Sequence, residues 1–286
     1  MKNFIHTSLL VIASIVISIT ILINYSSASY AIAKKEAPAK PLLIDSGKVK
    51  DVIKSDLIVL ENDKKYRLEN IRVPLQYDQE AVDLLSENIK GKNVLVYTHG
   101  KGGKVIKDRY GIPITQVIKE EESLWLQKLL ISKGLSWAYS TRENNNLMPS
   151  LLGFEQTARD NNFGLWSNSK YNLKTDINVK DHLNSYQVVE GTIIDTLVKK
   201  DSAYLNFGDD WRTDFTIKFD IEYWPEFKEK IKNFTIDRLK NKKVRIRGWV
   251  QDKNGPLIHL DHFNQIEIFK EKSKTRTKGK ERKDIL

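Results

Sequence analysis

YRLENIRVP at residues 66–74 and KDRYG at residues 107–111 are the two stretches that decide how this chain folds. In the first, apolar residues recur at strand-like spacing up to a proline, which is typical of a half-buried strand. An Asn-Asp pair at residues 62–63 predicts a turn before it, so this strand is the second arm of a hairpin. The second stretch ends in Tyr-Gly, which predicts a turn with a local ion pair.

Helical patterns surround these stretches. One starts at Asp78 and stops at Gly91, and a second is capped by Ser123 and ends at Gly134. Strands followed by inserted and appended helices favour a small barrel flanked by helices. The strands predicted in this block lie at residues 48–59, 65–73, 93–98 and 105–118, and a third helix lies at residues 149–160.

A second block of strands follows a polar stretch at residues 168–185. Five strands with one helix between the third and the fourth is the order of an OB-fold, a partly open Greek-key barrel. The strands are predicted at residues 187–197, 202–207, 214–219, 243–250 and 257–268, and the helix at residues 225–234.

Length and composition exclude several classes of protein. The chain has 286 residues, of which 40% are hydrophobic, so it can bury two domain cores. It has no cysteine, which excludes a disulfide framework, a thiolate zinc site, an iron–sulfur cluster and a cysteine nucleophile. The net charge of +10 makes polyanions plausible partners, and half of that charge lies in residues 270–286.

The N-terminus predicts export. Residues 9–23 read LLVIASIVISITILI, and small residues with an Ala-Ile-Ala pattern follow before Lys34. This run is intermediate between a secretory signal and a short membrane span. We expect residues 1–33 to be a signal peptide or an N-terminal membrane anchor. The rest of the chain would then be periplasmic or secreted, or held at the membrane by the uncleaved segment.

Taken together, the motifs resemble the staphylococcal-nuclease-like (thermonuclease) family. Beyond the stretches quoted above, the resemblance rests on Ser55-Asp56, on LLISKGLSWA at residues 129–138 and on the Gly-x-Trp end of the segment at residues 155–166. The second block looks like a C-terminal extension of some bacterial relatives. The fold class expected is mainly β with α, with a staphylococcal-nuclease-like OB barrel followed by a second OB-like five-stranded barrel. The predicted organisation is a leader or anchor (1–33), a linker (34–45), the nuclease-like domain (46–168), a linker (169–185), the OB-like domain (186–269) and a basic disordered tail (270–286).

The resemblance implies a specific chemistry. Phosphodiester hydrolysis in this family needs a calcium ion held by carboxylates, a glutamate base and two arginines that stabilise the phosphate. Asp56 matches one metal carboxylate and Arg67 matches the first arginine. Arg72 stands at the second carboxylate, Leu75 at the general base and Ile112 at the second arginine.

These replacements predict loss of activity. A general base contributes roughly 10²–10⁴ in rate and a phosphate donor roughly 10²–10³. An arginine in the metal site also repels a divalent cation. The chain is therefore predicted to be a pseudo-nuclease without a cofactor. Calcium enters only under the rival hypothesis, an active calcium-dependent nuclease that uses neighbours such as Asp78 or Glu80.

The remaining basic and aromatic residues predict binding. A bend near Asn70 would let Arg67 and Arg72 form a phosphate-binding pair. In the second barrel, strand alternation places Arg245 and Arg247 on one face with Trp249, which suits base stacking and phosphate contacts. The expected partner is single-stranded nucleic acid or an anionic membrane surface. A third hypothesis is a cell-envelope interaction module with no nucleic-acid role. Further rings of the same strands, Tyr204, Phe207, Trp211 and Phe215, either join that surface or fill the barrel core.

Overall fold

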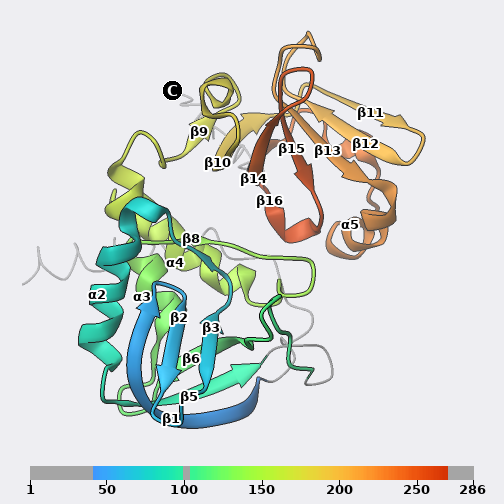
Figure 1. Ribbon diagram of the computed structural model, residues 1–286. Helices are drawn as coiled ribbons and strands as arrows, with labels where there is room; N and C mark the ends of the chain where they lie inside the picture. The colour runs from blue at the N-terminus through green and yellow to red at the C-terminus, as the bar shows by residue number, and fades with distance from the viewer. Residues whose placement is uncertain (1–40, 99–103, 270–286) are drawn as a thin grey trace, which may run out of the picture. The chain divides into compact units, whose positions relative to one another are not determined.

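The computed structural model describes residues 41–98 and 104–269, in which two sheets curl into two barrels (Figure 1). Strands predominate and the helices are few, so the expected mainly-β class with barrel-like sheets is confirmed. The predicted leader or anchor at residues 1–33 and the basic tail at residues 270–286 lie outside the described residues. None of the helices in the described part is long and apolar enough to cross a membrane.

The first barrel closes through one parallel pairing. Its sheet has the order β3-β2-β1-β5-β6-β7, and β3 also pairs with β6 in parallel register, with Arg67 opposite Ile114. This gives the circular order 1-2-3-5-4 of an OB barrel, counting its five main strands along the chain. The long first strand takes part in both halves because it pairs with β2 and with β5. The strands of this sheet are β1 (Leu42–Lys54), β2 (Leu57–Leu60), β3 (Lys65–Leu68), β5 (Asn93–Thr98), β6 (Ile114–Lys119) and β7 (Leu124–Trp125). β4 (Ile71–Arg72) and β8 (Trp137–Ala138) pair with each other in a separate two-stranded sheet.

Local sequence signals explain most of these boundaries. The predicted turn is present, with Asp63 at a φ of 62°. The strand predicted at residues 48–59 is two strands, because Ser55 and Asp56 turn the chain between β1 and β2. β1 also starts at Leu42, inside the segment expected to be a linker.

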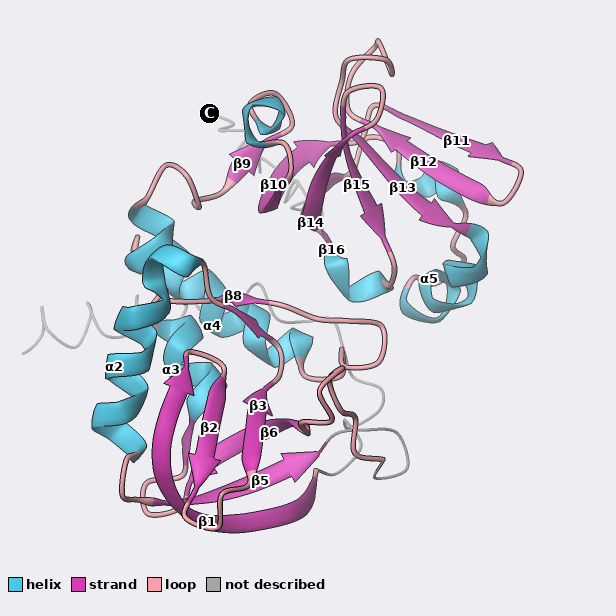
Figure 2. Cartoon of the chain, in the orientation of Figure 1, coloured by secondary structure: helices cyan, strands magenta, loops and turns pink. Residues whose placement is uncertain are grey.

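Three helices flank the first barrel and lie along its side (Figure 2). Two match the prediction closely, α2 (Asp78–Ile89) and α4 (Met148–Asp160). The third, α3 (Leu126–Ser132), starts later than expected. Ser123 does not cap it, because Ser123 adopts a φ of 52° in the turn before β7.

A backbone contact fixes the end of this domain. Gly134 and Gly164 both have positive φ, and a side-chain carbon at Gly134 would lie 2.2 Å from the carbonyl oxygen of Phe163. Only glycine allows the two segments to approach this closely. The N–H of Leu165 donates to the carbonyl of Gly134 at 2.8 Å. The Gly-x-Trp motif therefore packs against the turn that ends α3.

The second barrel repeats the strand order of the first. Its sheet runs β11-β12-β13-β15-β14-β10-β9, with β13 and β15 parallel. The first predicted strand is bent into two, β10 (Ser185–Thr192) and β11 (Asp195–Lys199), and their pairings lie at opposite ends of that order. The other elements are β9 (Lys174–Thr175), β12 (Ser202–Asn206), β13 (Thr216–Asp220), α5 (Trp224–Lys230), β14 (Lys243–Asp252), β15 (Pro256–Leu260) and β16 (Ile266–Ile268).

The segment expected to link the barrels is structured. Within residues 169–185, β9 pairs in parallel with β10, and the side chains of Tyr171 and Val179 are buried. Tyr171 belongs to an aromatic cluster that also contains Trp137, Trp166 and Tyr186. β8 and α4 of the first domain and β10 of the second barrel thus contribute to one small core, and the described residues, 41–98 and 104–269, belong to one compact unit.

Candidate nucleic-acid interface

Arg67 is held between two carboxylates. It lies on β3, next to the β1–β2 turn that carries Asp56 and to the turn before β6 that carries Asp108. Its Nη1 lies 2.5 Å from Oδ2 of Asp56, and its Nε lies 2.9 Å from Oδ2 of Asp108. Burial raises the pKa of Asp108, but the N–H of Ile112 and the guanidinium of Arg67 more than offset this and hold it below its usual range. Both carboxylates therefore neutralise Arg67.

Arg72 points to a different set of groups. Asn70 adopts a φ of 60°, which separates β3 from β4 and places β4 against β8. The predicted bend exists, but the expected phosphate-binding pair does not form, because Arg67 is bound by carboxylates and Arg72 by aromatic rings. The Cζ atom of Arg72 lies 4.5 Å from the ring centroid of Trp249, 5.4 Å from that of Tyr186 and 5.5 Å from that of Tyr139.

Leu75 and Ile112, at the positions of the general base and the second arginine, have no side-chain group that could replace either one. Leu75 opens a short 3-10 helix (Leu75–Tyr77) and its side chain is 91% exposed. Ile112 contributes its backbone N–H to Asp108 at 3.0 Å. Asp78 accepts a hydrogen bond from the hydroxyl of Ser55 at 2.5 Å, and Glu80 is exposed on α2. Within the described residues, no group of three or more His, Asp or Glu side chains is placed to hold a metal ion.

Arg245 and Arg247 do not form the expected surface with Trp249. Arg247 is fully buried, and its guanidinium contacts Glu155 at 3.0 Å and Glu267 at 2.7 Å. Arg245 is nearly as buried and its Nε donates to Glu190 at 2.8 Å. These guanidinium groups are covered by protein and paired with carboxylates, so they cannot contact phosphates at the surface.

Glu155 was missed at the level of sequence, although a signal was present. It lies on α4 in helical register with the buried residues Leu151 and Ala158. A carboxylate on the apolar face of a helix predicts a buried partner. That partner, Arg247, is 92 residues away on β14 of the second barrel.

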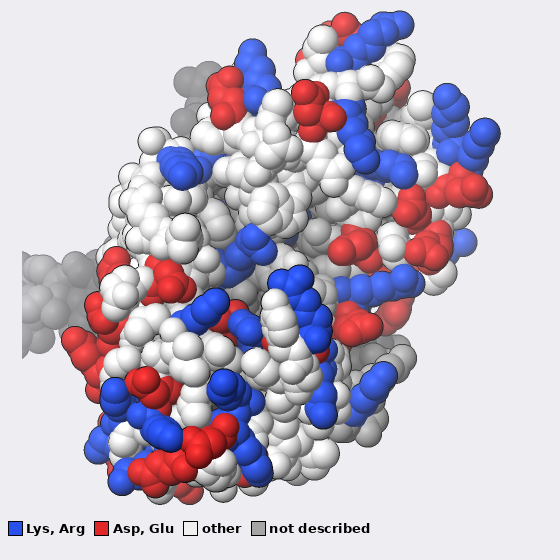
Figure 3. Space-filling model, viewed as in Figure 1, with Lys and Arg blue, Asp and Glu red and all other residues white. Residues whose placement is uncertain are grey.

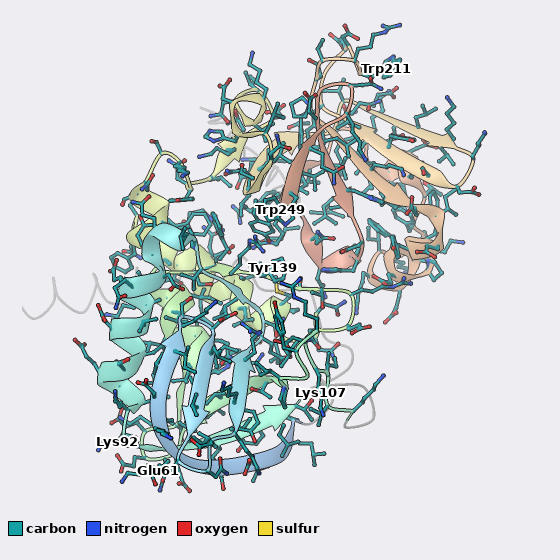
Figure 4. The ribbon with its side chains drawn as sticks, in the orientation of Figure 1. Glu61, Lys92, Lys107, Tyr139, Trp211 and Trp249 are labelled. Atoms are coloured by element: carbon teal, nitrogen blue, oxygen red, sulfur yellow. The ribbon has the colours of Figure 1, made fainter. Side chains whose placement is uncertain are left out.

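The aromatic residues of the second barrel divide between core and surface. Phe207 and Phe215 are buried with their ring centroids 4.9 Å apart, so they fill the core. Trp211 is 52% exposed at the end of the second barrel farthest from Trp249 (Figure 4). Arg212 lies over its ring at 4.9 Å, but it also forms an ion pair with Asp210 at 3.5 Å.

Charge is mixed over the described surface. Figure 3 shows basic side chains interspersed with acidic ones on the face in view. Nearly all of the net charge of +10 comes from segments outside the described residues, above all the tail. The folded part therefore has no large excess of positive charge, and a phosphate-binding site on it must depend on particular side chains.

Residues 57–168 match the family model described as Staphylococcal nuclease homologue. This part of the chain is a staphylococcal-nuclease-like domain. No curated protein shows a significant match to the chain. The second barrel lies outside the residues matched by the family model.

In the nuclease-like domain, the two matching functional groups are paired with each other. Asp56 was expected to be a metal ligand and Arg67 a phosphate ligand, and the structure joins them at 2.5 Å. A cation at Asp56 would have to compete with the guanidinium, and a phosphate at Arg67 would meet the charge of Asp56 and Asp108. This arrangement favours neither metal binding at Asp56 nor phosphate binding at Arg67.

Proposed function

We propose that this protein is a catalytically silent member of the staphylococcal nuclease family that acts by binding single-stranded nucleic acid. One observation carries the absence of hydrolysis. Arg67 is neutralised by Asp56 and Asp108, while an exposed leucine and an isoleucine occupy the base and second-arginine positions. With Arg67 neutralised and no charged side chain at the general-base and second-arginine positions, the transition state of hydrolysis is not stabilised.

The tail supports binding to a polyanion. Residues 270–286 contain eight Lys or Arg against three Asp or Glu. A basic segment of this kind contacts phosphates without sequence preference, and each contact releases condensed counterions. Binding should therefore be weak, independent of sequence and strongly dependent on salt.

The proposed location is outside the cytoplasm. It rests on the apolar run at residues 9–23 and the small residues that follow it. Fractionation of cells that produce the full chain with a C-terminal epitope tag tests this. We expect the protein in the extracytoplasmic or membrane fraction, and recovery in the cytoplasm would contradict the proposal.

Fluorescence anisotropy with labelled single-stranded oligonucleotides tests the binding function. We expect saturable binding at low salt, with log K falling by about 0.7 per contact for each unit of log salt. Sedimentation with anionic liposomes runs in parallel, because a polybasic tail also suits a membrane surface. Binding to liposomes without binding to any oligonucleotide would contradict the nucleic-acid proposal and favour the membrane.

A further inference from the structure

Arg72 is a cation that the described protein does not neutralise. Its backbone N–H donates to the hydroxyl of Ser136 at 2.9 Å, but in residues 41–98 and 104–269 its guanidinium has neither a hydrogen bond nor an ion pair. None of its nitrogen atoms is a buried polar atom without a partner. Each guanidinium nitrogen therefore keeps some contact with solvent, although the residue as a whole is half-buried.

The aromatic rings around Arg72 hold it in a defined position. Trp249, Tyr186 and Tyr139 all lie within the range of a cation–π interaction. The rings also contact one another, since the centroids of Tyr139 and Tyr186 are 5.6 Å apart and those of Tyr186 and Trp249 are 6.4 Å apart. Figure 4 shows the labelled side chains of Tyr139, which follows β8, and of Trp249 on β14 close to each other. We call Arg72, Tyr139, Tyr186 and Trp249 the Arg72 cluster.

When aromatic rings stack on a guanidinium group, the N–H donors along its edge stay free to bind an anion. Rings interact with the flat faces of the group, whereas its five N–H donors point outward in its plane. An anion that reaches this edge can accept two parallel hydrogen bonds, as a phosphate does. Arg72 also avoids the entropy cost of ordering a free side chain, because the rings already position it.

Trp249 adds a second kind of contact at the same place. Although Arg72 lies over its ring, 46% of the residue remains exposed. An exposed indole beside a fixed cation suits a nucleotide, because a base can stack on the ring while its phosphate meets the cation. Double-stranded nucleic acid fits less well, since its bases are stacked on each other.

We propose that the Arg72 cluster is the site at which this chain binds single-stranded nucleic acid, with a backbone phosphate at Arg72 and a base on Trp249. This proposal rests on the function proposed above and locates it. It also gives the replacement at residue 72 a role. The arginine that stands in place of a metal carboxylate becomes a phosphate ligand in a site completed by the second barrel.

The chain contains a matched control. Trp211 and Arg212 also form an exposed Trp–Arg stack, but Arg212 is paired with Asp210. If any exposed tryptophan with a nearby arginine could bind single-stranded nucleic acid, changes at Trp211 and Arg212 would weaken binding as much as changes at Trp249 and Arg72. The site we propose depends on an arginine without a carboxylate, so the control stack should contribute little.

Fluorescence anisotropy of the full chain and four variants, with a labelled oligothymidine at several salt concentrations, tests this site. We expect Arg72→Gln to weaken binding about tenfold and to reduce the salt slope by about 0.7, since one phosphate contact is lost. Trp249→Leu should weaken binding about tenfold without changing the slope, because stacking contributes roughly 1–3 kcal/mol per base but neutralises no phosphate. Trp211→Leu and Arg212→Gln should remain within twofold of the parent.

An abasic strand of the same length separates the two contacts. On this strand Trp249→Leu should have a much smaller effect than on oligothymidine, because only its contact with Arg72 is lost, while Arg72→Gln should still weaken binding. Far-UV circular dichroism and melting temperature identify variants that fail to fold, and Trp249→Phe serves as a conservative replacement that should retain most of the stacking. If the parent binds oligothymidine but Arg72→Gln and Trp249→Leu bind equally well, the assignment of the site is wrong and the proposed function stands. If the parent does not bind at all, the proposed function fails as well.

Discussion

The guanidinium of Arg247 on β14 donates hydrogen bonds of 3.0 Å to both carboxylate oxygens of Glu155 on α4, and both side chains are fully buried. Burial raises the pKa of Glu155, but the charge of Arg247 and its hydrogen bond more than offset this and keep the carboxyl ionised. The pair joins a helix of the nuclease-like domain to a strand of the second barrel. The Arg247–Glu155 ion pair, which is shielded from water, therefore links the second barrel to the nuclease-like domain.

Removing one partner of this pair should be costly. Glu155→Gln leaves the Arg247 guanidinium buried with an incomplete set of acceptors, and we expect a loss of about 3 kcal/mol in the free energy of unfolding. Urea denaturation followed by tryptophan fluorescence measures it. The exposed pair of Arg142 and Glu222, 3.5 Å apart, provides the control, and Glu222→Gln should cost less than about 1 kcal/mol. Equal effects of the two variants would show that the buried pair does not hold the barrels together.

Lys174 predicts an unusual dependence of stability on pH. Its side chain is 1% exposed, and its Nζ donates to the carbonyl of Ser169 at 2.6 Å and to Asn172 at 2.7 Å. Burial lowers the pKa of Lys174 from 10.5 to about 8. Below pH 8 both the folded and the unfolded chain are protonated, so folding bears the full cost of the buried ammonium. Between pH 8 and 10.5 the folded state loses its proton first and this cost falls.

The stability of the parent relative to Lys174→Met should therefore rise from pH 8 to pH 10.5. Urea denaturation of both proteins at half-unit steps of pH gives this difference. Other groups that titrate in this range contribute equally to both proteins and cancel. Parallel pH profiles for the two proteins would show that the Lys174 amine is not desolvated in the folded state.

Calcium should not bind to the parent at millimolar concentrations, because Arg67 occupies the carboxylate expected to hold it. Arg67→Met would leave Asp56 and Asp108 without their shared cation, and we expect weak, saturable calcium binding to appear in titration calorimetry. Lys64→Met is the control, since it removes a cation from a different carboxylate, Asp45. Tight calcium binding by the parent would contradict the assignment of Arg67 as the group that closes the metal site.

The tail should contribute strongly to the salt dependence of nucleic-acid binding, whereas Arg67 should contribute nothing to it. Removal of residues 270–286 should flatten the salt slope by several units, because eight basic side chains are lost. Arg67→Ala should leave the slope unchanged, since Arg67 is already neutralised by two carboxylates. The sequence alone predicts a change of about one unit for Arg67→Ala. A change of that size would show that Arg67 contacts phosphate and that its ion pairs open on binding.

The sequence was sufficient for features that depend on local patterns. β5 has the predicted bounds Asn93–Thr98, and α4 extends only one residue beyond the prediction. The order of strands and helices also predicted the OB arrangement of the second barrel, because that topology follows from which elements occur in succession. The bend at Asn70 came from the family resemblance and is present.

The environment of each charged side chain was not predictable in the same way. Alternation correctly grouped Arg245, Arg247 and Trp249 on one face, but it carries no information on what covers that face. The first two residues are buried against acidic residues from α4, β10 and β16, while Trp249 remains exposed. Arg72 meets rings 67 or more positions along the chain. Such contacts arise when segments that are far apart in the sequence pack together, and no periodicity within one strand predicts them.

A cleavage assay with a labelled single-stranded oligonucleotide and the purified protein, lacking residues 1–33, decides whether this chain binds nucleic acid without hydrolysing it. The reaction contains saturating protein and millimolar calcium, and product is followed on denaturing gels alongside anisotropy of the same strand. We expect the strand to be bound and to remain intact, because Leu75 and Ile112 replace the base and the second arginine and Arg67 is held by Asp56 and Asp108. Calcium-dependent product formed over multiple turnovers, and abolished by Arg67→Ala, would contradict it.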